Sequence, residues 1–543
     1  MELNNYQKQV MRDLSAYLNC VNHSADLFSA WREYWFAKDI AVGLGGVPSY
    51  NNSIERVPHV CMKVPTGGGK TFMACAAVKR IFDALPNGKP QVVVWLVPSD
   101  SILTQTIRNL SDADHPYRQR LNQDFNGNVG VYTKEQLLIG HAFSPDSVRE
   151  MLTVCIMSYS SLRINSRNRD VRKVYQENGN LFRFAEYFKD KDVLLADTPD
   201  TALIQVLRHL EPVVIVDESH NAGSDLSTEM LNNLNPSFVL DLTATPRKNS
   251  NIISYVDARE LKKEHMVKLP VVVYNRTTRQ SVIQDAIQLR GSIERDAIAA
   301  EAAGGKYIRP IVLFQAQPRT GDSSDTFDKI KEMLIGMGIP EDQIAVKTSN
   351  VDDLKGQDLM SRDCKVRYII TVNALKEGWD CPFAYILASL ANRTSAVDVE
   401  QILGRILRQP YAMQHKSPLL NTSYVLTNSV DFHTTLEKIV AGLNKAGFSR
   451  RDYRIGEAVE SSHTPVKPEA AQTEIPLDVQ AAEDDAFDDV NVQEVKTALE
   501  GAAPTAAAVS AMVQEAAQQA ADYTAAINEA DDGFMGGELG DML

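Results

Sequence analysis

Short runs of apolar residues, rich in valine, isoleucine and leucine, recur along the first 430 residues and alternate with stretches of helical periodicity. Both faces of each run are apolar, which predicts central strands of parallel sheets that helices cover on both sides. The runs form two series, and these predict two doubly wound α/β domains. The first series comprises residues 57–64, 91–97, 153–157, 212–216 and 238–242, and the second comprises residues 308–314, 366–372, 385–390 and 423–427.

The division between the two domains is expected within residues 247–269, and the helical pattern of residues 278–303 suits either side of it. Beyond about residue 460 the apolar runs cease. We therefore predict a first domain at residues 1–255, a second at 256–460 and a tail at 461–543.

The tail consists mainly of Ala, Glu, Asp, Gln and Pro. Such a segment buries too little apolar surface to offset its ordering entropy, so we predict that it is mostly disordered. Residues 494–521 contain enough alanine for a transient helix, which Pro504 would interrupt.

Charge is distributed unevenly along the chain. Of 56 basic and 70 acidic residues, the tail holds two and 17, which leaves 54 basic and 53 acidic residues in 1–460. The net charge of −14 therefore belongs to the tail, and the nearly neutral body can still carry a basic groove for a polyanion.

Localisation signals are few. The N-terminus lacks the basic-then-apolar layout of a secretory signal, and the apolar runs are too short to cross a membrane. The six cysteines have no paired spacing, so we expect neither disulfides nor a zinc site. We expect most of them to be buried, and the protein to reside in a reducing cytoplasm.

The first chemical motif is the segment PTGGGKT, residues 65–71, between a predicted strand and a predicted helix. Glycines let backbone N–H groups converge on phosphate oxygens, and the helix that follows adds the positive end of its dipole. The motif therefore predicts a nucleotide site formed by Thr66, Gly67, Gly68 and Gly69, with Lys70 on the β- and γ-phosphates of ATP and Thr71 on Mg²⁺. The alternative is an ordinary glycine turn, and Val64 departs from the usual Gly or Ala at the start of the pattern.

The second motif is Asp217-Glu218-Ser219-His220, directly after an apolar strand. Two carboxylates at the end of a buried strand are costly unless a cation or ligand receives them. We expect Asp217 to bind Mg²⁺ together with Thr71, and Glu218 to deprotonate the water that attacks the γ-phosphate. The alternative is a surface acidic turn. For His220, coupling to the next motif and a simple hydrogen-bonded role are equally open.

Two further segments complete the pattern. Thr243 and Thr245 lie in a tight turn after another strand, which is either a γ-phosphate relay or an ordinary exit from the strand. In the second half, Gln401, Arg405 and Arg408 are spaced to share one helix face, where two guanidinium groups suit phosphate oxygens. A solvated basic stripe is the alternative for this face.

Gly378 and Asp380 lie in the segment that follows the predicted strand 366–372. They are candidates for contact with the nucleotide ribose or with the arginine pair.

These blocks, in this order, resemble the motifs of superfamily 2 helicases of the DExH type. Within that superfamily the motif sequences are most similar to those of the helicase (Res) subunit of type III restriction endonucleases, over roughly residues 1–460. The segments that carry this likeness are VPTGGGKT, DESHN, LTATPR, ALKEGWDCPFAYILA and VEQILGRILRQPYA.

The resemblance implies two tandem RecA-like domains with ATP bound between them and nucleic acid as the partner. It implies that Gln7 reads the adenine and that Pro98 and Ser99 line the nucleic-acid groove. We expect phosphate contacts from Ser99, Thr371 and backbone amides, so that binding weakens with salt and shows little sequence preference. Duplex DNA is the favoured substrate, in a restriction-type system with a methyltransferase or a separate nuclease as partner.

One departure concerns the nuclease domain that follows the motor in such endonucleases, where Asp and Glu-x-Lys residues bind Mg²⁺. The tail holds Glu494-Val495-Lys496, but in polar, alanine-rich sequence, so we do not expect cleavage by this chain. Cleavage would then belong to another polypeptide, to a longer form of this chain, or to no part of the system. The other readings are a DExH RNA helicase and a binding module that ATP switches.

Overall fold

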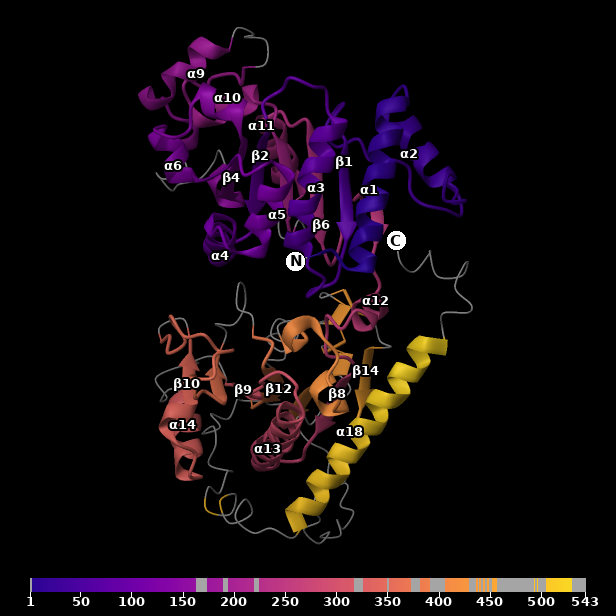
Figure 1. The fold of residues 1–543 in the computed structure, drawn as a ribbon, viewed down its shortest axis with the longest axis vertical. Helices are drawn as coiled ribbons and strands as arrows, with labels where there is room; N and C mark the ends of the chain where they lie inside the picture. Colours follow the sequence, from indigo (N-terminus) through magenta and orange to yellow (C-terminus); the bar gives the residue numbers. More distant parts are fainter. Residues whose placement is uncertain are drawn as a thin grey trace, which may run out of the picture. The chain divides into compact units, whose positions relative to one another are not determined.

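The computed structural model divides into unit 1, Met1–Glu264, and unit 2, His265–Asp532 (Figure 1). The structure describes residues 2–529 apart from 163–172, 189–193, 219–223, 317–325, 349–350, 373–380, 391–405, 429–435, 438, 441–442, 445–446, 449–451, 457–492, 494–495 and 497–503.

Unit 1 contains a seven-stranded parallel sheet with strand order β3-β4-β2-β5-β6-β1-β7. Its register places Lys63 of β1 beside Thr243 of β6, and Asp217 of β5 beside Leu242 of β6. The segments that follow these three strands therefore leave the sheet at one edge. The strands are β1 (His59–Lys63), β2 (Val92–Val97), β3 (Val129–Thr133), β4 (Leu152–Ser158), β5 (Val213–Asp217), β6 (Phe238–Thr243) and β7 (Ile252–Tyr255).

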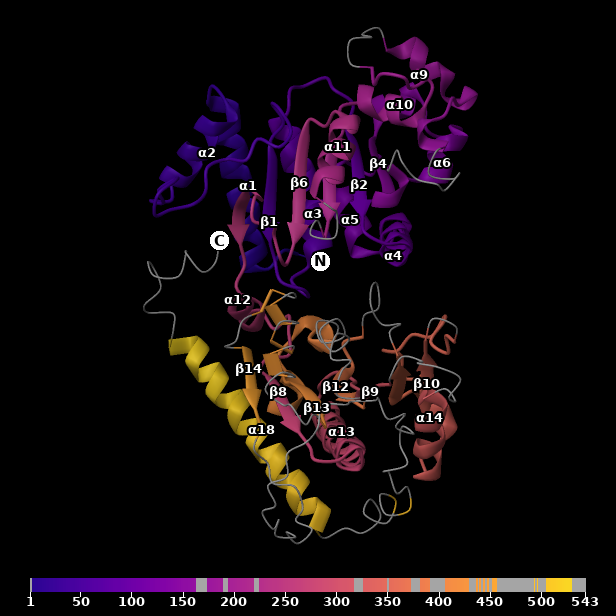
Figure 2. The same cartoon turned by 180° about the vertical axis from the view of Figure 1, so that it is seen from behind.

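Helices cover both faces of this sheet (Figures 1 and 2). Helix α3 packs on β5 and β6 with α1 and α5 beside it, and the core that includes α10 and α11 uses alternate residues of β2 and β5. The main helices of unit 1 are α1 (Asn5–His23), α2 (Leu27–Phe36), α3 (Lys70–Ala84), α4 (Asp100–Ser111), α5 (Pro116–Asp124), α6 (Lys134–Ile139), α7 (Pro145–Glu150), α9 (Phe182–Tyr187), α10 (Leu203–His209), α11 (Ser224–Leu234) and α12 (Ala258–Lys263).

Unit 2 contains a second seven-stranded parallel sheet, with order β10-β11-β9-β12-β13-β8-β14. Helix α13 packs on its central strands β9, β12 and β13. The strands are β8 (Val271–Asn275), β9 (Ile311–Gln315), β10 (Ile344–Lys347), β11 (Tyr368–Thr371), β12 (Ala384–Ser389), β13 (Ser423–Thr427) and β14 (Tyr453–Ile455), and the main helices are α13 (Arg279–Ala302), α14 (Thr326–Gly336) and α18 (Pro504–Glu529). Each unit is thus an α/β domain built on a parallel sheet, as the apolar pattern of the sequence predicted.

All nine predicted strands are present, and five further strands were not predicted. Four of the five, β3, β7, β10 and β14, lie at sheet edges. Edge strands such as β3 and β14 are only partly buried, so their apolar pattern is interrupted. The fifth strand, β8, is an apolar run that was not predicted as a strand; it lies directly after the segment predicted to divide the domains.

The division after Glu264 places α12 in unit 1, whereas the predicted boundary at 255/256 precedes this helix. The helical segment 278–303 belongs to unit 2 as α13, whose N-cap is Thr278. No helix in the part of the chain that the structure describes combines the length and the apolar character needed to span a bilayer.

The tail differs from the prediction over residues 504–529, which form the long helix α18. Pro504 lies at its first position, where a missing N–H costs nothing, and so does not interrupt it. One face of α18 is buried at three- and four-residue spacing, by Met512, Ala516, Ala520, Tyr523 and Ile527. Its alanines allow close packing against the rest of unit 2, including α13. Apart from residues 493 and 496, the rest of the tail lies outside the described residues.

Polar contacts also hold α18, among them two made by tyrosine hydroxyls. The Tyr523 hydroxyl donates to Oδ1 of the buried Asp452 at 2.6 Å, and the Tyr274 hydroxyl donates to the Met512 carbonyl at 3.1 Å. We predict that Tyr523→Phe lowers the unfolding free energy of unit 2 by about 2 kcal/mol, because a buried carboxylate loses a donor. Urea unfolding measures this loss. The exposed Gln514→Ala on the same helix serves as control, and an equal effect of both changes would contradict the packing of α18.

Candidate functional site

The glycine loop, residues 65–69, joins β1 to α3. Gly67 and Gly69 have φ of 86° and 76°, in the left-handed region that favours glycine. The Gly68 N–H donates to the Pro65 carbonyl at 3.0 Å, which closes a turn. Gly69 is the N-cap of α3, so the unpaired N–H groups of the first helical turn begin at this loop. A loop of this shape can bind an anion.

Lys70, the first residue of α3, forms an ion pair with Glu218. Its Nζ lies 2.9 Å from Glu218 Oε1, and the two side chains are 10% and 24% exposed. Glu218 has φ of 52°, which is strained for a residue with a side chain, and its N–H donates to the Leu242 carbonyl of β6 at 2.8 Å. The neighbouring strand therefore holds Glu218 in the conformation that aims its carboxylate at Lys70.

Asp217, the last residue of β5, is buried beside this pair. Burial and the adjacent Glu218 carboxylate raise the pKa of Asp217 to about 7, against the smaller opposing effect of Lys70. The Tyr159 hydroxyl donates to the Asp217 carbonyl and fixes the end of the strand. Among the described residues, Lys70 forms the ion pair with Glu218 and also favours the charged form of Asp217, but its effect is smaller than that of burial.

A bound divalent cation would offset the cost of burying the Asp217 charge. Asp217 supplies a buried carboxylate and Thr71, in the first turn of α3, supplies a hydroxyl, and these are oxygen donors of the kind that Mg²⁺ prefers. Burial is the largest cause of the raised pKa of Asp217, and a bound divalent cation would favour its charged form. The residues therefore fit Mg²⁺.

The Thr243–Thr245 turn is bonded to the start of the glycine loop. The Val64 N–H donates to the Thr243 carbonyl at 2.9 Å, and the Thr245 N–H donates to Thr243 Oγ1 at 3.2 Å. This turn lies at the end of β6. In the sheet, β6 lies between β1, which leads into the glycine loop, and β5, which leads into Glu218. The three segments that sequence analysis singled out in the first half thus lie together.

Gln7 on α1 also reaches the glycine loop, where it is almost fully buried. Its Nε2 donates to the Gly68 carbonyl at 3.2 Å, and its Oε1 accepts the Asn4 N–H at 3.0 Å. Contact of Gln7 with adenine stays a prediction. The preceding residue, Tyr6, was not singled out by the sequence, yet its hydroxyl donates to the same Gly68 carbonyl at 2.9 Å.

The predicted nucleic-acid contacts have different surroundings. Pro98 and Ser99 follow β2 at the same edge of the sheet and are half-buried, and Ser99 Oγ caps α4 by accepting the Ile102 N–H. Thr371 ends β11 in unit 2 and is fully buried, so we do not retain a direct contact of its side chain with nucleic acid.

Arg408 is exposed and pairs with Val267 in an isolated antiparallel bridge. The remaining predicted residues, His220, Gly378, Asp380, Gln401 and Arg405, lie outside the described residues.

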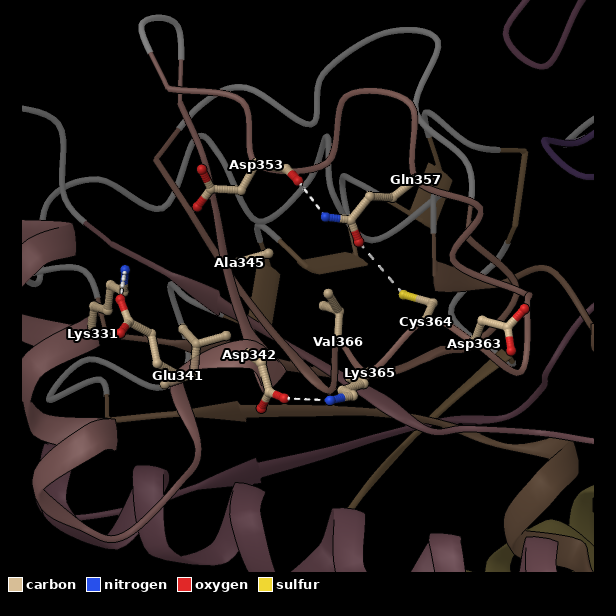
Figure 3. A pocket seen from close by; sticks show the side chains of 11 residues that line it. Lys331, Glu341, Asp342, Ala345, Asp353, Gln357, Asp363, Cys364, Lys365 and Val366 are labelled. Atoms are coloured by element: carbon tan, nitrogen blue, oxygen red, sulfur yellow. Dashed lines mark hydrogen bonds and ion pairs between the residues drawn. The ribbon is translucent and has the colours of Figure 1, made fainter.

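Unit 2 has a pocket of about 510 Å³ where β10 and β11 begin (Figure 3). Four of its six charged side chains form ion pairs with one another: Lys365 with Asp342 at 2.9 Å, and Lys331 with Glu341 at 2.8 Å. It lies at the opposite end of these strands from Thr371. The pairing leaves this pocket a weaker candidate than the site of unit 1.

Comparison with known proteins confirms the resemblance over the first unit. Residues 1–248 match the family model described as type III restriction enzyme, res subunit. A comparison with curated proteins gives no match.

Similar solved structures include the ATP-dependent type ISP restriction-modification enzyme LlaBIII bound to DNA, with 13% identity over 83% of this chain and 30% of that chain, and a TM-score of 0.47. The Mycobacterium smegmatis helicase Lhr, bound to single-stranded DNA and AMP-PNP, has 15% identity over 77% and 50% of the two chains and a TM-score of 0.38. Mss116p, bound to single-stranded RNA and AMP-PNP, has 11% identity over 75% and 72%, with a TM-score of 0.39. The chain thus spans 30% and 50% of the lengths of the first two proteins.

The raised pKa of Asp217 predicts a pH-dependent effect of Asp217→Asn. The folded state holds the Asp217 proton up to about pH 7 and the unfolded state releases it near pH 4, so wild-type stability falls as the pH rises between these values. We expect Asp217→Asn to stabilise the protein at pH 8 by the order of 2–4 kcal/mol relative to its effect at pH 4. Urea unfolding at both pH values measures this difference. The exposed Asp114→Asn is the control, and a pH-independent effect of Asp217→Asn would contradict the assigned pKa.

Proposed function

We propose that this chain is an ATP hydrolase that drives movement along nucleic acid, with duplex DNA as its substrate. The observation that supports this most directly is the group formed by the glycine loop, Lys70, Asp217 and Glu218 at one edge of the unit 1 sheet. It combines an anion-binding loop, a mobile cation, a cation-binding carboxylate and a candidate base. Hydrolysis of a nucleoside triphosphate needs these four components.

In this proposal the triphosphate lies against the glycine loop and the N-terminus of α3. Lys70 then exchanges Glu218 for phosphate oxygens, which are the stronger anionic partner. The exchange frees the Glu218 carboxylate to accept a proton from the attacking water. Thr71 and Asp217 hold Mg²⁺, which when bound neutralises charge on the phosphate oxygens. The Lys70–Glu218 pair thus keeps the base occupied until the phosphates enter.

The other predicted residues complete the proposal. Gln7 reads the adenine, Gln401, Arg405 and Arg408 contact the nucleotide, and Gly378 and Asp380 contact its ribose or the arginine pair. Pro98 and Ser99 contact the nucleic-acid strand.

A restriction-type role is supported by the family model that residues 1–248 match. We infer from it a motor that acts on DNA together with a methyltransferase or specificity subunit, or with a separate nuclease. The strand is held mostly through its phosphates, so affinity falls with rising salt. The nearly neutral body does not oppose such binding, because residues 1–460 carry no large net negative charge.

Glu218→Gln tests the assignment of the base. The variant keeps a side chain of the same shape but cannot accept the proton, so we expect turnover to fall by at least 100-fold. ATP should still bind, and binding should be no weaker than in the wild type, because Lys70 loses its competing partner. Lys70→Ala should lose binding itself. Steady-state hydrolysis and equilibrium titration separate these outcomes, and undiminished hydrolysis by Glu218→Gln would refute the role of the base.

Stimulation by nucleic acid tests the substrate. We expect duplex DNA to raise the hydrolysis rate of the wild-type chain more than single-stranded DNA or RNA does, and to do so less at higher salt. Stronger stimulation by RNA would support an RNA helicase. No stimulation by any strand, with slow hydrolysis, would support a binding module that ATP switches.

A further inference from the structure

The glycine loop is held from outside by two side chains of α1. The Tyr6 hydroxyl and Gln7 Nε2 both donate to the carbonyl of Gly68, at 2.9 and 3.2 Å. The two side chains are 5% and 1% exposed, so neither contact is open to solvent. These bonds join residues separated by about 60 positions in the sequence, and they end on the backbone of the loop.

The bonded carbonyl belongs to the Gly68–Gly69 peptide, which is trans. In a trans peptide the C=O and N–H bonds point in opposite directions. Because α1 holds the carbonyl on its own side, the Gly69 N–H points away from α1. Among the described residues no acceptor is bonded to that N–H, whereas the Gly68 N–H is already used by the Pro65 carbonyl. The Gly69 N–H is therefore available to an anion.

Close packing around the glycine loop fixes the contact between α1 and the Gly68–Gly69 peptide. A Cβ on Gly69 would lie 2.6 Å from Gln7 Nε2, so the Gln7 amide packs directly on this glycine. Helix α12 closes the same region, since Leu261 Cδ2 lies 3.5 Å from the position of a Cβ on Gly68. Glu264 Oε1, just after α12, accepts the Asn5 N–H at 3.2 Å and so holds the start of α1.

Burial raises the pKa of Tyr6 and keeps its hydroxyl protonated, so it remains a donor throughout the physiological range. The neighbouring Gln7 amide has a second fixed partner in the Asn4 N–H. Both donors are thus permanent and oriented before any ligand enters.

We propose that Tyr6 is a positioning residue of the phosphate site: its hydroxyl, assisted by Gln7, orients the Gly68–Gly69 peptide so that the Gly69 N–H faces a phosphate oxygen of the bound nucleotide. This inference rests on the proposed function, because it assumes that the glycine loop binds a triphosphate. It adds a role for a residue on α1 that touches no ligand itself. The role is preorganisation, which lowers the cost of ordering the loop during binding.

Tyr6→Phe removes the hydroxyl alone and tests the proposal by binding. We expect the Kd for ADP and for a nonhydrolysable ATP analogue to rise about 5- to 10-fold, and the Kd for adenosine to stay unchanged. Titration calorimetry or competition with a fluorescent nucleotide measures all three. Tyr132→Phe is a matched control, since Tyr132 is equally buried in unit 1 and its hydroxyl donates to the Ala142 carbonyl at 3.0 Å, away from the loop.

Gly69→Ala disturbs the same contact from the loop, because its Cβ would displace the Gln7 amide while the sequence of α1 stays unchanged. It should show the same loss for phosphorylated ligands only, so the proposal stays testable if Tyr6→Phe lowers the melting temperature strongly. Equal loss for adenosine, or equal effects of Tyr6→Phe and Tyr132→Phe, would overturn the positioning role and leave the proposed function standing. No binding of ATP by the wild-type chain would overturn both.

Discussion

The charge balance at the end of β5 is the constraint on which the unit 1 site depends. Two adjacent carboxylates, Asp217 and Glu218, lie beside Lys70 in a region where burial leaves charged groups short of solvent. The protein meets this shortage by placing Glu218 against Lys70 and by raising the pKa of Asp217. Under the proposed function, a triphosphate at Lys70 and a divalent cation at Asp217 would reverse both adjustments. The site without its ligands is therefore complementary to them in charge.

The fold creates this balance through the register of parallel strands. Strands β1, β6 and β5 are neighbours, and their carboxyl ends meet at one edge, so three segments distant in sequence supply one site. The backbone then fixes details that charge alone would not. The Leu242 carbonyl accepts the N–H of the strained Glu218, and the Thr243 carbonyl accepts the Val64 N–H just before the glycine loop. Helix α1 also holds the glycine loop, because Tyr6 and Gln7 donate hydrogen bonds to the Gly68 carbonyl.

Much of this arrangement follows from the sequence, because buried parallel strands carry a continuous apolar signal and their chemistry follows each strand directly. Lys70, Asp217 and Glu218 could be assigned to one edge on that basis. Tyr6 could not, since its role depends on which loop carbonyl a helix side chain reaches, and no periodicity encodes that. The partly buried edge strands were missed for lack of a continuous pattern. For the region of α18 the sequence predicted only a transient helix within residues 494–521, because an alanine-rich segment with few large apolar side chains resembles a disordered tail until its partner surface is known.

The most direct test of this account is the proton balance of nucleotide binding. Titration calorimetry of Mg²⁺ and a nonhydrolysable ATP analogue near pH 7, in buffers of different ionisation enthalpy, measures the protons released. If Mg²⁺ replaces the proton on Asp217, whose pKa is about 7, the wild-type protein should release about half a proton more than Asp217→Asn. Equal release by the two proteins, or binding that leaves the Lys70–Glu218 pair intact, would contradict the claim that phosphate and metal resolve the charge imbalance of this site.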